Sequence, residues 1–340
     1  VLHICGSPTN RYYHDLSLLY ASKVIAADGF EGSFLVIDPD QKWYSGKSLD
    51  TLAAVHSIAD VAEIATASDV GVNHLFCRRG VAAFRAFFED ILRLPLVGSS
   101  ATVQTIATDK ALTKARLAAA GVSVPKGEVV MRHQSVDSIA ARVDTYPCIV
   151  KPVSEDNSLG LSLVDSAEGL EEALEAGWAY DDRLLIEEYI AGSEIRTCVI
   201  ESENGELYVP AMIEYGVSLE TPIRLSRHKL DTDPNTGRPI SQTTSEEVPA
   251  RCPADLSDSL HREIARQSQA SHRALGCRDF SLWDFRVDRE TGQPSVIEAG
   301  LFWAFGTISM ISRMLAADGI SLADEAARLW TRAAARKSDT

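Results

Sequence analysis

Hydrophobic and polar positions along residues 1–108 alternate between short apolar runs and segments with helical spacing. The apolar runs predict strands at Leu2–Cys5, Ser33–Ile37, Val72–Cys77 and Leu96–Val97. The helical spacing predicts helices over 15–28, 60–67 and 81–93. This βαβ alternation is typical of a small parallel sheet covered by helices on both faces, so we expect an α/β domain over 1–108.

After residue 108 the pattern becomes that of a compact α+β unit, which we expect to span 109–187. A helix is predicted from about Thr108, as its N-cap, to Gly121. Further predicted elements are strands at 147–151, 161–164 and 184–186 and a helix over 165–177. Glu168 is placed to complete a capping box for that helix.

From Glu194 onward the pattern indicates antiparallel strands, within a C-terminal unit expected to span 188–340. Residues 195–201 and 206–215 flank Asn204-Gly205, which is a strong hairpin signal. The polar stretch 216–250 is long enough to be a lid or a disordered loop. The remaining predicted elements are a helix over 257–276, a hairpin over 280–298 and a helix after Ser321.

Two acidic residues stand on the predicted hairpin over 280–298, Asp284 near the middle of its first strand and Glu298 at the end of its second. Counting outward from the turn at 289–292 places them opposite each other, within about one residue of register. Two neighbouring carboxylates repel, so a positive charge must lie between them, and a divalent metal suits oxygen ligands. The pattern therefore predicts a metal site at Asp284 and Glu298.

Length and charge narrow the class of protein. A chain of 340 residues is long enough for two or three domains. The net charge of −15 argues against nucleic acid or an anionic membrane as a partner, although local basic clusters leave room for a small anionic ligand.

The cysteines and the apolar runs bear on the compartment. The six scattered cysteines favour free thiols in a reducing compartment over disulfides or a zinc site. The first residues predict a strand rather than a signal peptide, and no apolar run approaches membrane-spanning length. We expect a soluble, cytoplasmic protein.

Several polar residues have both an ordinary explanation and a functional one. Lys110, in the first turn of its helix, and Lys151, at the end of an apolar strand, are either surface lysines or phosphate contacts. The loop 154–160 is either a polar connection or a flap whose backbone N–H groups close over phosphates. Glu187 and Glu194 are either solvated acids or the edge of an adenosine site. The P-loop motif Gly-x-x-x-x-Gly-Lys does not occur.

In this order and with these spacings, the residues resemble the ATP-grasp superfamily, and within it the D-alanine–D-alanine ligase branch. The resemblance covers roughly 95–340 well and 1–94 in outline. It rests on Val97-Gly98-Ser99, Asp109-Lys110, Lys151-Pro152, 155–160, 187–194, Asp284-Phe285-Arg286 and Glu298. It implies a three-subdomain ATP-grasp architecture: a small parallel βαβ N-terminal domain, a central α+β lid, and a C-terminal antiparallel sheet with helices.

The resemblance implies a role for each matched residue. The residues expected to bind ATP are Lys110, Lys151, Ser158, Glu187, Glu188, Ile190 and Glu194. In the family the lysines contact phosphates, Glu187 and the backbone of 188–190 hold adenine, and Glu194 holds the ribose. Asp284 and Glu298 would hold Mg²⁺. The catalytic residues implied are Lys151, Lys229, which matches the family's lid lysine only loosely, and Arg286.

Four positions on the substrate side depart from the family pattern. Tyr13 stands where the family has a carboxylate for the ammonium of the first D-alanine, and Phe76-Cys77 replaces a His-Gly motif. Leu282 replaces an arginine that stabilises the tetrahedral oxyanion. Gly300 replaces an asparagine metal ligand, and the Pro-Gly turn that follows is altered to 301–306.

The loss at Leu282 bears on the product. Losing an oxyanion donor typically costs on the order of 100-fold in rate. Either Arg286 or Arg227 substitutes for the lost arginine, or the chemistry at the acceptor differs. A D-alanine dipeptide is therefore not the expected product.

These observations favour an ATP-dependent carboxylate–amine ligase that works through an acyl phosphate on amino acids or small peptides, with specialised-metabolite biosynthesis as a reasonable setting. Intramolecular amide formation, giving a lactam, is an alternative with the same chemistry. A nucleotide-binding pseudoenzyme and a phosphotransferase that stops at the acyl phosphate are the rivals from other classes. Trp303, Phe302 and Phe305 either shape the acceptor pocket or belong to the core. The oligomeric state, including a homodimer, stays open.

Overall fold

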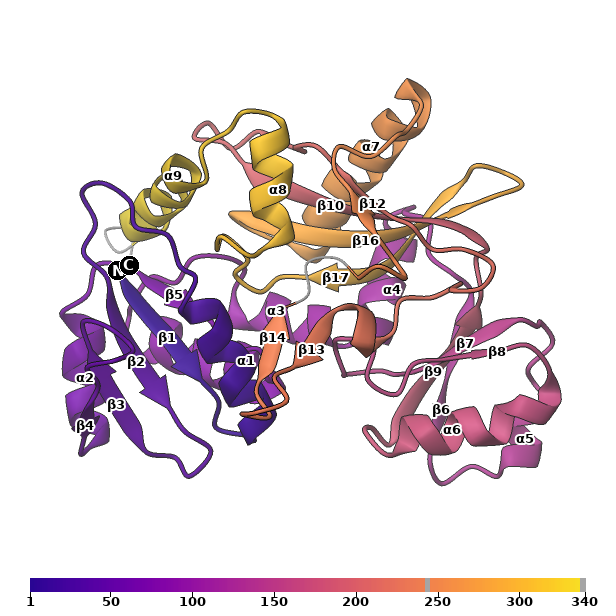
Figure 1. Ribbon diagram of the computed structural model, residues 1–340, viewed down its shortest axis with the longest axis horizontal. Helices are drawn as coiled ribbons and strands as arrows, with labels where there is room; N and C mark the ends of the chain where they lie inside the picture. Colours follow the sequence, from indigo (N-terminus) through magenta and orange to yellow (C-terminus); the bar gives the residue numbers. More distant parts are fainter. Residues whose placement is uncertain (242–244, 337–340) are drawn as a thin grey trace.

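The computed structural model describes residues 1–241 and 245–336, in which the strands form four sheets (Figure 1). The first sheet has the order β4-β3-β2-β1-β5. The elements of this N-terminal part are β1 (Leu2–Gly6), α1 (Arg11–Ala21), β2 (Ser33–Ile37), β3 (Trp43–Gly46), β4 (Ala53–Val55), α2 (Ile58–Thr66), β5 (Gly71–Asn73) and the π-helical turns η1 (Gly80–Phe84) and η2 (Phe87–Ile91).

The N-terminal sheet is mixed rather than parallel. β1 is parallel to β2 and to β5, as predicted, whereas β2, β3 and β4 form an antiparallel meander. The prediction missed β3 and β4 because these strands are short and partly exposed, so they lack a continuous apolar run. Leu96 makes only an isolated parallel bridge with Gly71 instead of the predicted strand.

The central part contains an antiparallel sheet with the order β6-β9-β7-β8. Its elements, with the two helices that precede them, are α3 (Ala101–Thr108), α4 (Lys110–Ala119), β6 (Gly127–Met131), α5 (Val136–Ala140), β7 (Cys148–Pro152), β8 (Ser162–Val164), η3 (Ala167–Gly169), α6 (Leu170–Trp178) and β9 (Arg183–Glu188). Apolar side chains of α5 and α6 form one buried cluster with those of the sheet, including Ile139, Leu174 and Leu184. The opposite face of the sheet is left free to line the site described below.

Two predicted helix starts in the central part differ from the structure. The N-cap of α4 is Asp109 rather than Thr108, and its carboxylate accepts the Leu112 N–H at 2.9 Å. Asp is the stronger capping residue, because its charge also complements the helix dipole. The capping box predicted at Glu168 is wrong, since Glu168 lies in a 3₁₀ turn before α6 and the N-cap of α6 is Gly169.

The C-terminal part contains an antiparallel sheet with the order β15-β12-β10-β16-β17, to which β11 adds beside β10, and a small hairpin of β13 and β14. Its elements are β10 (Gly192–Glu201), β11 (Leu207–Tyr208), β12 (Ile213–Tyr215), η4 (Ser226–His228), β13 (Leu230–Thr232), β14 (Pro239–Ser241), β15 (Ala250–Arg251), α7 (Asp258–Leu275), β16 (Phe280–Asp288), β17 (Pro294–Gly300), α8 (Met310–Ala317) and α9 (Leu322–Ala335).

Strand alternation gives the large C-terminal sheet two different faces. Trp283, Phe285 and Val287 on β16 pack with α7 in one buried cluster. Phe280 and Leu282, on the other face, pack with Trp303, Phe305, α8 and α9. Because side chains alternate along a strand, Asp284 and Arg286 share the face of Leu282. Trp303 and Phe305 therefore belong to the core.

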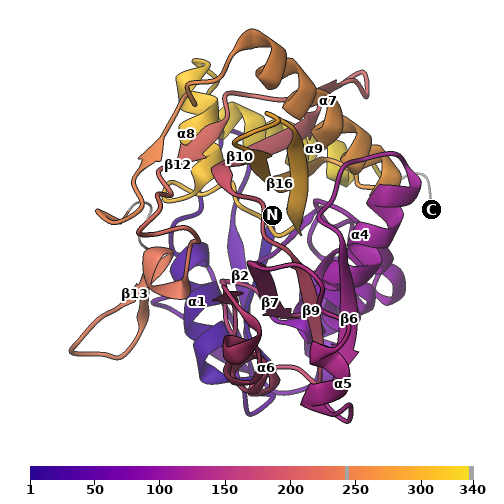
Figure 2. The same ribbon diagram turned by 90° about the vertical axis from the view of Figure 1, so that its right-hand side faces the viewer.

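The hairpin predicted over 280–298 is confirmed, and Asp284 pairs directly with Glu298 across β16 and β17. A bulge follows at Asp284/Phe285 and shifts the register beyond that pair. Within the predicted lid, 216–250, residues 242–244 lie outside the described part, as do 337–340 of the predicted C-terminal unit. The small hairpin inside the lid lies against α1 of the N-terminal part, and both views show it there (Figures 1 and 2).

The three large sheets follow the three predicted units, except that β9 of the central sheet extends to Glu188, one residue past the predicted boundary at 187/188. The boundaries of the units stay predictions. Among the described residues, none of the helices has both the length and the apolar character needed to cross a bilayer. The six cysteines, all in the described part, are free.

Asp279 joins the N-terminal part to the C-terminal part. This fully buried carboxylate accepts the Gly98 N–H at 2.7 Å and pairs with Arg336 at 2.9 Å. We expect Asp279→Asn to lower stability by about 2–3 kcal/mol, because it leaves the partly buried Arg336 without its counter-charge. Asn also tolerates the left-handed φ of 66° at this position, so the backbone should persist.

The measurement is the midpoint of thermal unfolding, which should fall by several degrees. The matched control is Asp255→Asn, which removes an exposed pair with Arg251 and should cost less than about 0.5 kcal/mol. Equal losses in the two variants would contradict the role of Asp279.

Candidate active site

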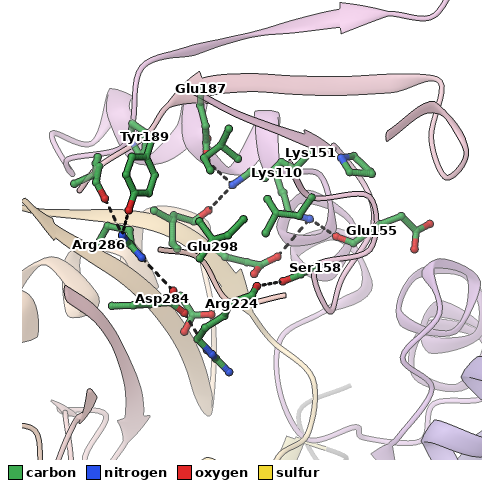
Figure 3. Close-up of a pocket in the computed structure, with 18 of the residues that line it drawn as sticks. Lys110, Lys151, Glu155, Ser158, Glu187, Tyr189, Arg224, Asp284, Arg286 and Glu298 are labelled. Atoms are coloured by element: carbon green, nitrogen blue, oxygen red, sulfur yellow. Dashed lines mark hydrogen bonds and ion pairs between the residues drawn. The ribbon is translucent and has the colours of Figure 1, made fainter. Parts of the chain in front are cut away.

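One cavity of about 750 Å³ brings together every residue that the sequence singled out for ATP, metal or catalysis. These residues are Lys110, Lys151, Ser158, Glu187, Glu188, Ile190, Glu194, Lys229, Asp284, Arg286 and Glu298. They come from α4, the strands β7 and β9, the flap 154–160, the polar loop 216–250, β10 and the hairpin β16–β17. Figure 3 labels seven of them and shows these side chains converging from separate elements: Lys110, Lys151, Ser158, Glu187, Asp284, Arg286 and Glu298.

The paired carboxylates on β16 and β17 are surrounded by cations. Arg196, opposite Asp284 on β10, donates to it from Nε and Nη2 at 2.6 Å each. Lys110 Nζ lies 3.3 Å from Glu298. Burial alone would raise the pKa of Glu298, but Lys110, Lys229 and other nearby cations hold it at about 2. Glu298 is therefore ionised at neutral pH.

A second carboxylate, Glu187 on β9, holds two lysines. Lys151 Nζ lies 2.5 Å from Oε1 of Glu187, and Lys114 Nζ lies 2.9 Å from Oε2. Burial opposes ionisation of Glu187, but the two lysines prevail and lower its pKa. Because Lys114 is also buried, its own pKa falls to about 8, despite Glu187 beside it. Sequence analysis missed Lys114, although its spacing of four residues from Lys110 puts both lysines on one face of α4.

The flap between β7 and β8 is tied down on two sides. Ser158 Oγ donates to the Arg224 carbonyl at 2.8 Å, so the flap contacts the polar loop. Tyr13 on α1 donates its hydroxyl to Glu155 at 2.8 Å. Burial raises the pKa of Asp156, and the negative charge of Glu298 raises it further. The flap, which lines the cavity, is thus anchored both to the polar loop and to the N-terminal part.

The far end of the cavity combines apolar walls with a clamp around Glu194. Arg224 lies 2.9 Å and Arg286 3.5 Å from this carboxylate. Arg286 also donates to the Ile190 carbonyl at 3.1 Å and to the Tyr189 hydroxyl at 3.0 Å. Side chains such as those of Ile149, Leu159, Leu161, Ile223 and Ile297 line the same cavity. Apolar walls with backbone groups at the edge suit a flat heteroaromatic ring.

Two further cavities adjoin the carboxylate pair on the substrate side, with volumes of about 880 and 1200 Å³. Both contain Gly300 and Phe302, and they share Asp156 and Glu298 with each other. A Cβ added at Gly300 would lie 3.3 Å from the Phe302 ring, so Phe302 occupies the space of a larger side chain at 300.

A row of three aromatic rings borders these two cavities. The ring centroids of Tyr20 and Phe76 lie 5.1 Å apart, and those of Phe76 and Phe302 lie 5.4 Å apart. Tyr20 lines the smaller cavity, Phe76 lines the larger one, and Phe302 lines both. Of the three aromatics whose place the sequence left open, Phe302 alone borders the substrate side.

The residues present fit a single magnesium ion. Asp284 and Glu298 supply hard oxygen donors from adjacent strands, beside the lysines expected to hold phosphates. Each carboxylate retains acceptor capacity beyond its present contacts. Within the described residues no group of three or more His, Cys, Asp or Glu could form a complete protein cage. Mg²⁺ does not need one, since it takes its remaining ligands from phosphate and water.

Comparisons with known proteins agree with this geometry. The family model described as D-ala D-ala ligase C-terminus matches residues 116–330. The D-alanine–D-alanine ligase of Chlorobium luteolum is 28% identical, over 93% of this chain and 92% of that protein.

Two solved structures share the fold. The D-alanine–D-alanine ligase from Coxiella burnetii matches with a TM-score of 0.76 and 21% identity, over 99% of this chain and 94% of that chain. The VanG D-Ala:D-Ser ligase from Enterococcus faecalis matches with the same score and identity, over 96% and 97%. The predicted ATP-grasp architecture is confirmed.

The lowered pKa of Lys114 predicts a pH dependence of stability. Below pH 8 this lysine is protonated in both the folded and the unfolded chain; between about 8 and its ordinary 10.5 only the unfolded chain keeps the proton. Because the unfolded state then binds more protons, Lys114 makes folding more favourable as pH rises through this window.

We expect the difference in unfolding free energy between the natural chain and Lys114→Met to shift in favour of the natural chain from pH 8 to 10. Denaturant unfolding at several pH values measures it. Lys126→Met is the control, because it removes a positive charge at an exposed lysine. Its effect at each pH is subtracted from that of Lys114→Met. A constant difference across the window would contradict the burial of a charged Lys114.

Proposed function

The chain belongs to the D-alanine–D-alanine ligase family of ATP-dependent, carbon–nitrogen bond-forming ligases, and from that premise we propose that it joins a carboxylate of an amino acid or small peptide to an amine through an acyl phosphate. The observation that carries the proposal is the meeting of Lys110, Lys151, Asp284 and Glu298 in one cavity. Phosphoryl transfer requires this combination of positioned positive charge and paired carboxylates.

The first step transfers the γ-phosphoryl group. A substrate carboxylate oxygen bonds to the γ-phosphorus while the bond from that phosphorus to the β-phosphate oxygen breaks, which releases ADP. Lys110 and Lys151 lie where they can orient the phosphates and offset their charge. Mg²⁺, when bound by Asp284 and Glu298, supplies further positive charge to the phosphate oxygens.

The second step forms the amide. The amine attacks the acyl carbon, phosphate leaves with the electrons of the broken C–O bond, and the nitrogen loses a proton to solvent or a nearby base. An acyl phosphate hydrolyses readily, so the site must exclude water. The contacts of Ser158 with Arg224 and of Tyr13 with Glu155 support this role for the flap, since they hold it on two sides.

We propose that the substrate is larger and more apolar than D-alanine. Tyr20, Phe76 and Phe302 present aromatic rings to the substrate-side cavities, and Leu282 and Gly300 offer no polar group to a small zwitterion. The relative whose title names a D-Ala:D-Ser ligase shows that the acceptor differs among proteins of this fold. Apolar side chains in these cavities would gain about 25 cal/mol for each Å² removed from water.

The test is ADP release by the purified protein with ATP, Mg²⁺ and pools of amino acids and dipeptides, followed by mass spectrometry of the product. We expect release that depends on substrate and is strongest with large apolar side chains. A product mass equal to one substrate less water indicates a lactam, and the sum of two substrates less water indicates a ligation. D-Alanine dipeptide as the preferred product would overturn the substrate assignment, and ATP binding without release in any pool would overturn the ligase chemistry.

A single substitution tests the carboxylate pair. Glu298→Gln keeps the shape of the side chain but removes the charge that Lys110 faces, so turnover should fall at least ~100-fold while the fold persists. Circular dichroism and the ADP-release assay measure the two properties. Glu290→Gln, at an exposed glutamate in the turn of the same hairpin, is the control and should keep normal turnover. Near-normal activity of Glu298→Gln would remove this residue from the site.

A further inference from the structure

The amide-forming step develops negative charge on the former carbonyl oxygen, and the residue expected to meet that charge is absent. Leu282, where the family carries an arginine, is buried and apolar. Its cross-strand neighbour Gly300 brings no side chain. A tetrahedral oxyanion without a preorganised positive partner is costly to form, so another group has to supply the charge.

Arg196 places a guanidinium at the same cluster from a neighbouring strand. In the register of β10 and β16, Arg196 pairs with Asp284 and Cys198 pairs with Leu282. Opposite residues in a sheet share a face, so Arg196 lies on the face that carries Asp284 and Leu282. Position 282, where the family has an arginine, and Arg196 therefore lie on neighbouring strands and on the same face of the sheet. Along the strands they are offset by one side chain of that face.

The geometry of Arg196 suits a fixed charge. Its bidentate contact with Asp284 holds the planar group in one orientation, and its side chain is only 20% exposed. The side chain nevertheless lines the cavity of about 880 Å³ that also contains Leu282, Asp284, Glu298 and Gly300. Among the described residues the structure records no hydrogen bond for its third nitrogen, Nη1, which leaves a donor for a ligand.

The two arginines that the sequence offered as substitutes have other contacts. Arg286 donates to Tyr189, Ile190 and Pro222, at the nucleotide end of the first cavity. Arg227 is exposed and lies 3.5 Å from Glu247, outside the three cavities. A third arginine, Arg224, lines the same cavity as Arg196 but is paired with Glu194 at 2.9 Å, whereas Arg196 is paired with Asp284 of the carboxylate pair itself. Arg196 is therefore the arginine of that cavity placed directly beside the carboxylate pair.

We propose that Arg196 is a catalytic residue of this ligase, which stabilises the oxyanion of the amide-forming step in place of the arginine missing at 282. The inference rests on the proposed carboxylate–amine ligase function. When the amine nitrogen adds to the acyl carbon, the carbonyl π electrons move to oxygen, and the guanidinium of Arg196 meets that charge. Re-formation of the C=O bond then expels phosphate.

The test separates the two chemical steps in Arg196→Gln, which keeps a hydrogen-bonding side chain but removes the charge. Exchange of ¹⁸O between the β,γ-bridge and the β-nonbridging positions of ATP reports acyl-phosphate formation alone. We expect this exchange to stay within about threefold of normal, while amide formation falls on the order of 100-fold. Arg196→Lys retains a positive charge without the planar guanidinium, so its rate of amide formation should lie between those of the natural chain and Arg196→Gln. Arg251→Gln, at an exposed arginine paired with Asp255, is the control and should leave both steps unchanged.

Metal affinity distinguishes this role from one of merely holding Asp284 in place. Removing a cation from Asp284 should leave the binding of Mn²⁺ with ADP equal or tighter, because a competing positive charge is gone. If Arg196 only positions Asp284, Mn²⁺ affinity should weaken and both chemical steps should fall together. Electron paramagnetic resonance of Mn²⁺ measures the affinity without turnover.

Two further variants test directly whether an arginine at position 282 can replace Arg196. Leu282→Arg in the natural chain should not raise the rate, because Arg196 already supplies the charge. The double variant Arg196→Gln/Leu282→Arg should recover at least tenfold over Arg196→Gln. If thermal melting shows that the double variant does not fold, millimolar guanidinium ion added to Arg196→Gln provides the same test. We expect the guanidinium ion to restore part of the rate of amide formation.

The outcomes separate this inference from the proposed function. Substrate-dependent ADP release in the natural chain, with Arg196→Gln forming amide at a near-normal rate, overturns the role of Arg196 and leaves the ligase function standing. A joint fall of both steps with weaker Mn²⁺ binding also overturns it, in favour of positioning. If the natural chain releases no ADP in any pool, the proposed ligase function itself has failed.

Discussion

The carboxylates of Asp284 and Glu298, placed directly opposite each other on β16 and β17, are the constraint on which the rest of the site depends. Two like charges at adjacent strand positions in a mostly buried setting require compensation, because neither water nor a remote counter-charge can offset them cheaply. The chain provides that compensation from three elements: Arg196 on β10, Lys110 on α4 and Lys229 in the polar loop. The central part and the C-terminal part must therefore pack together for this charge cluster to be complete.

Much of the fold and of the nucleotide side of the site could be predicted from the sequence, because the signals there are local. The hairpin of β16 and β17 has two apolar runs around a glycine-containing turn, which indicates the hairpin and places Asp284 within about one residue of Glu298. The bulge that makes the two residues direct partners is not visible in the sequence. Lys110 and Lys151 stand at the start of a helix and near the end of a strand, positions that pattern alone identifies. These predictions needed no information about distant parts of the chain.

The remainder could not be predicted, because it depends on which separate elements meet. Arg196 became a candidate only through the register of β10 against β16, about ninety residues later in the chain. Lys114 could be placed on the face of α4 that carries Lys110, but its partner Glu187 lies on β9. The short strands β3 and β4 were not predicted, because they are partly exposed and their sequences contain no long apolar run.

The mutual pairing of charges in the cavity has a consequence for the nucleotide recognition that we propose there. Lys151 is already matched by Glu187, and Lys110 by Glu298, so an incoming polyphosphate meets cations that are neutralised rather than bare. Binding is then an exchange of ion pairs, in which new contacts replace old ones and the net gain is smaller than the number of contacts suggests. A lone inorganic anion cannot displace several internal partners at once, whereas a triphosphate that also fills the apolar slot can. Discrimination against small anions is thus built into the resting state of the cleft.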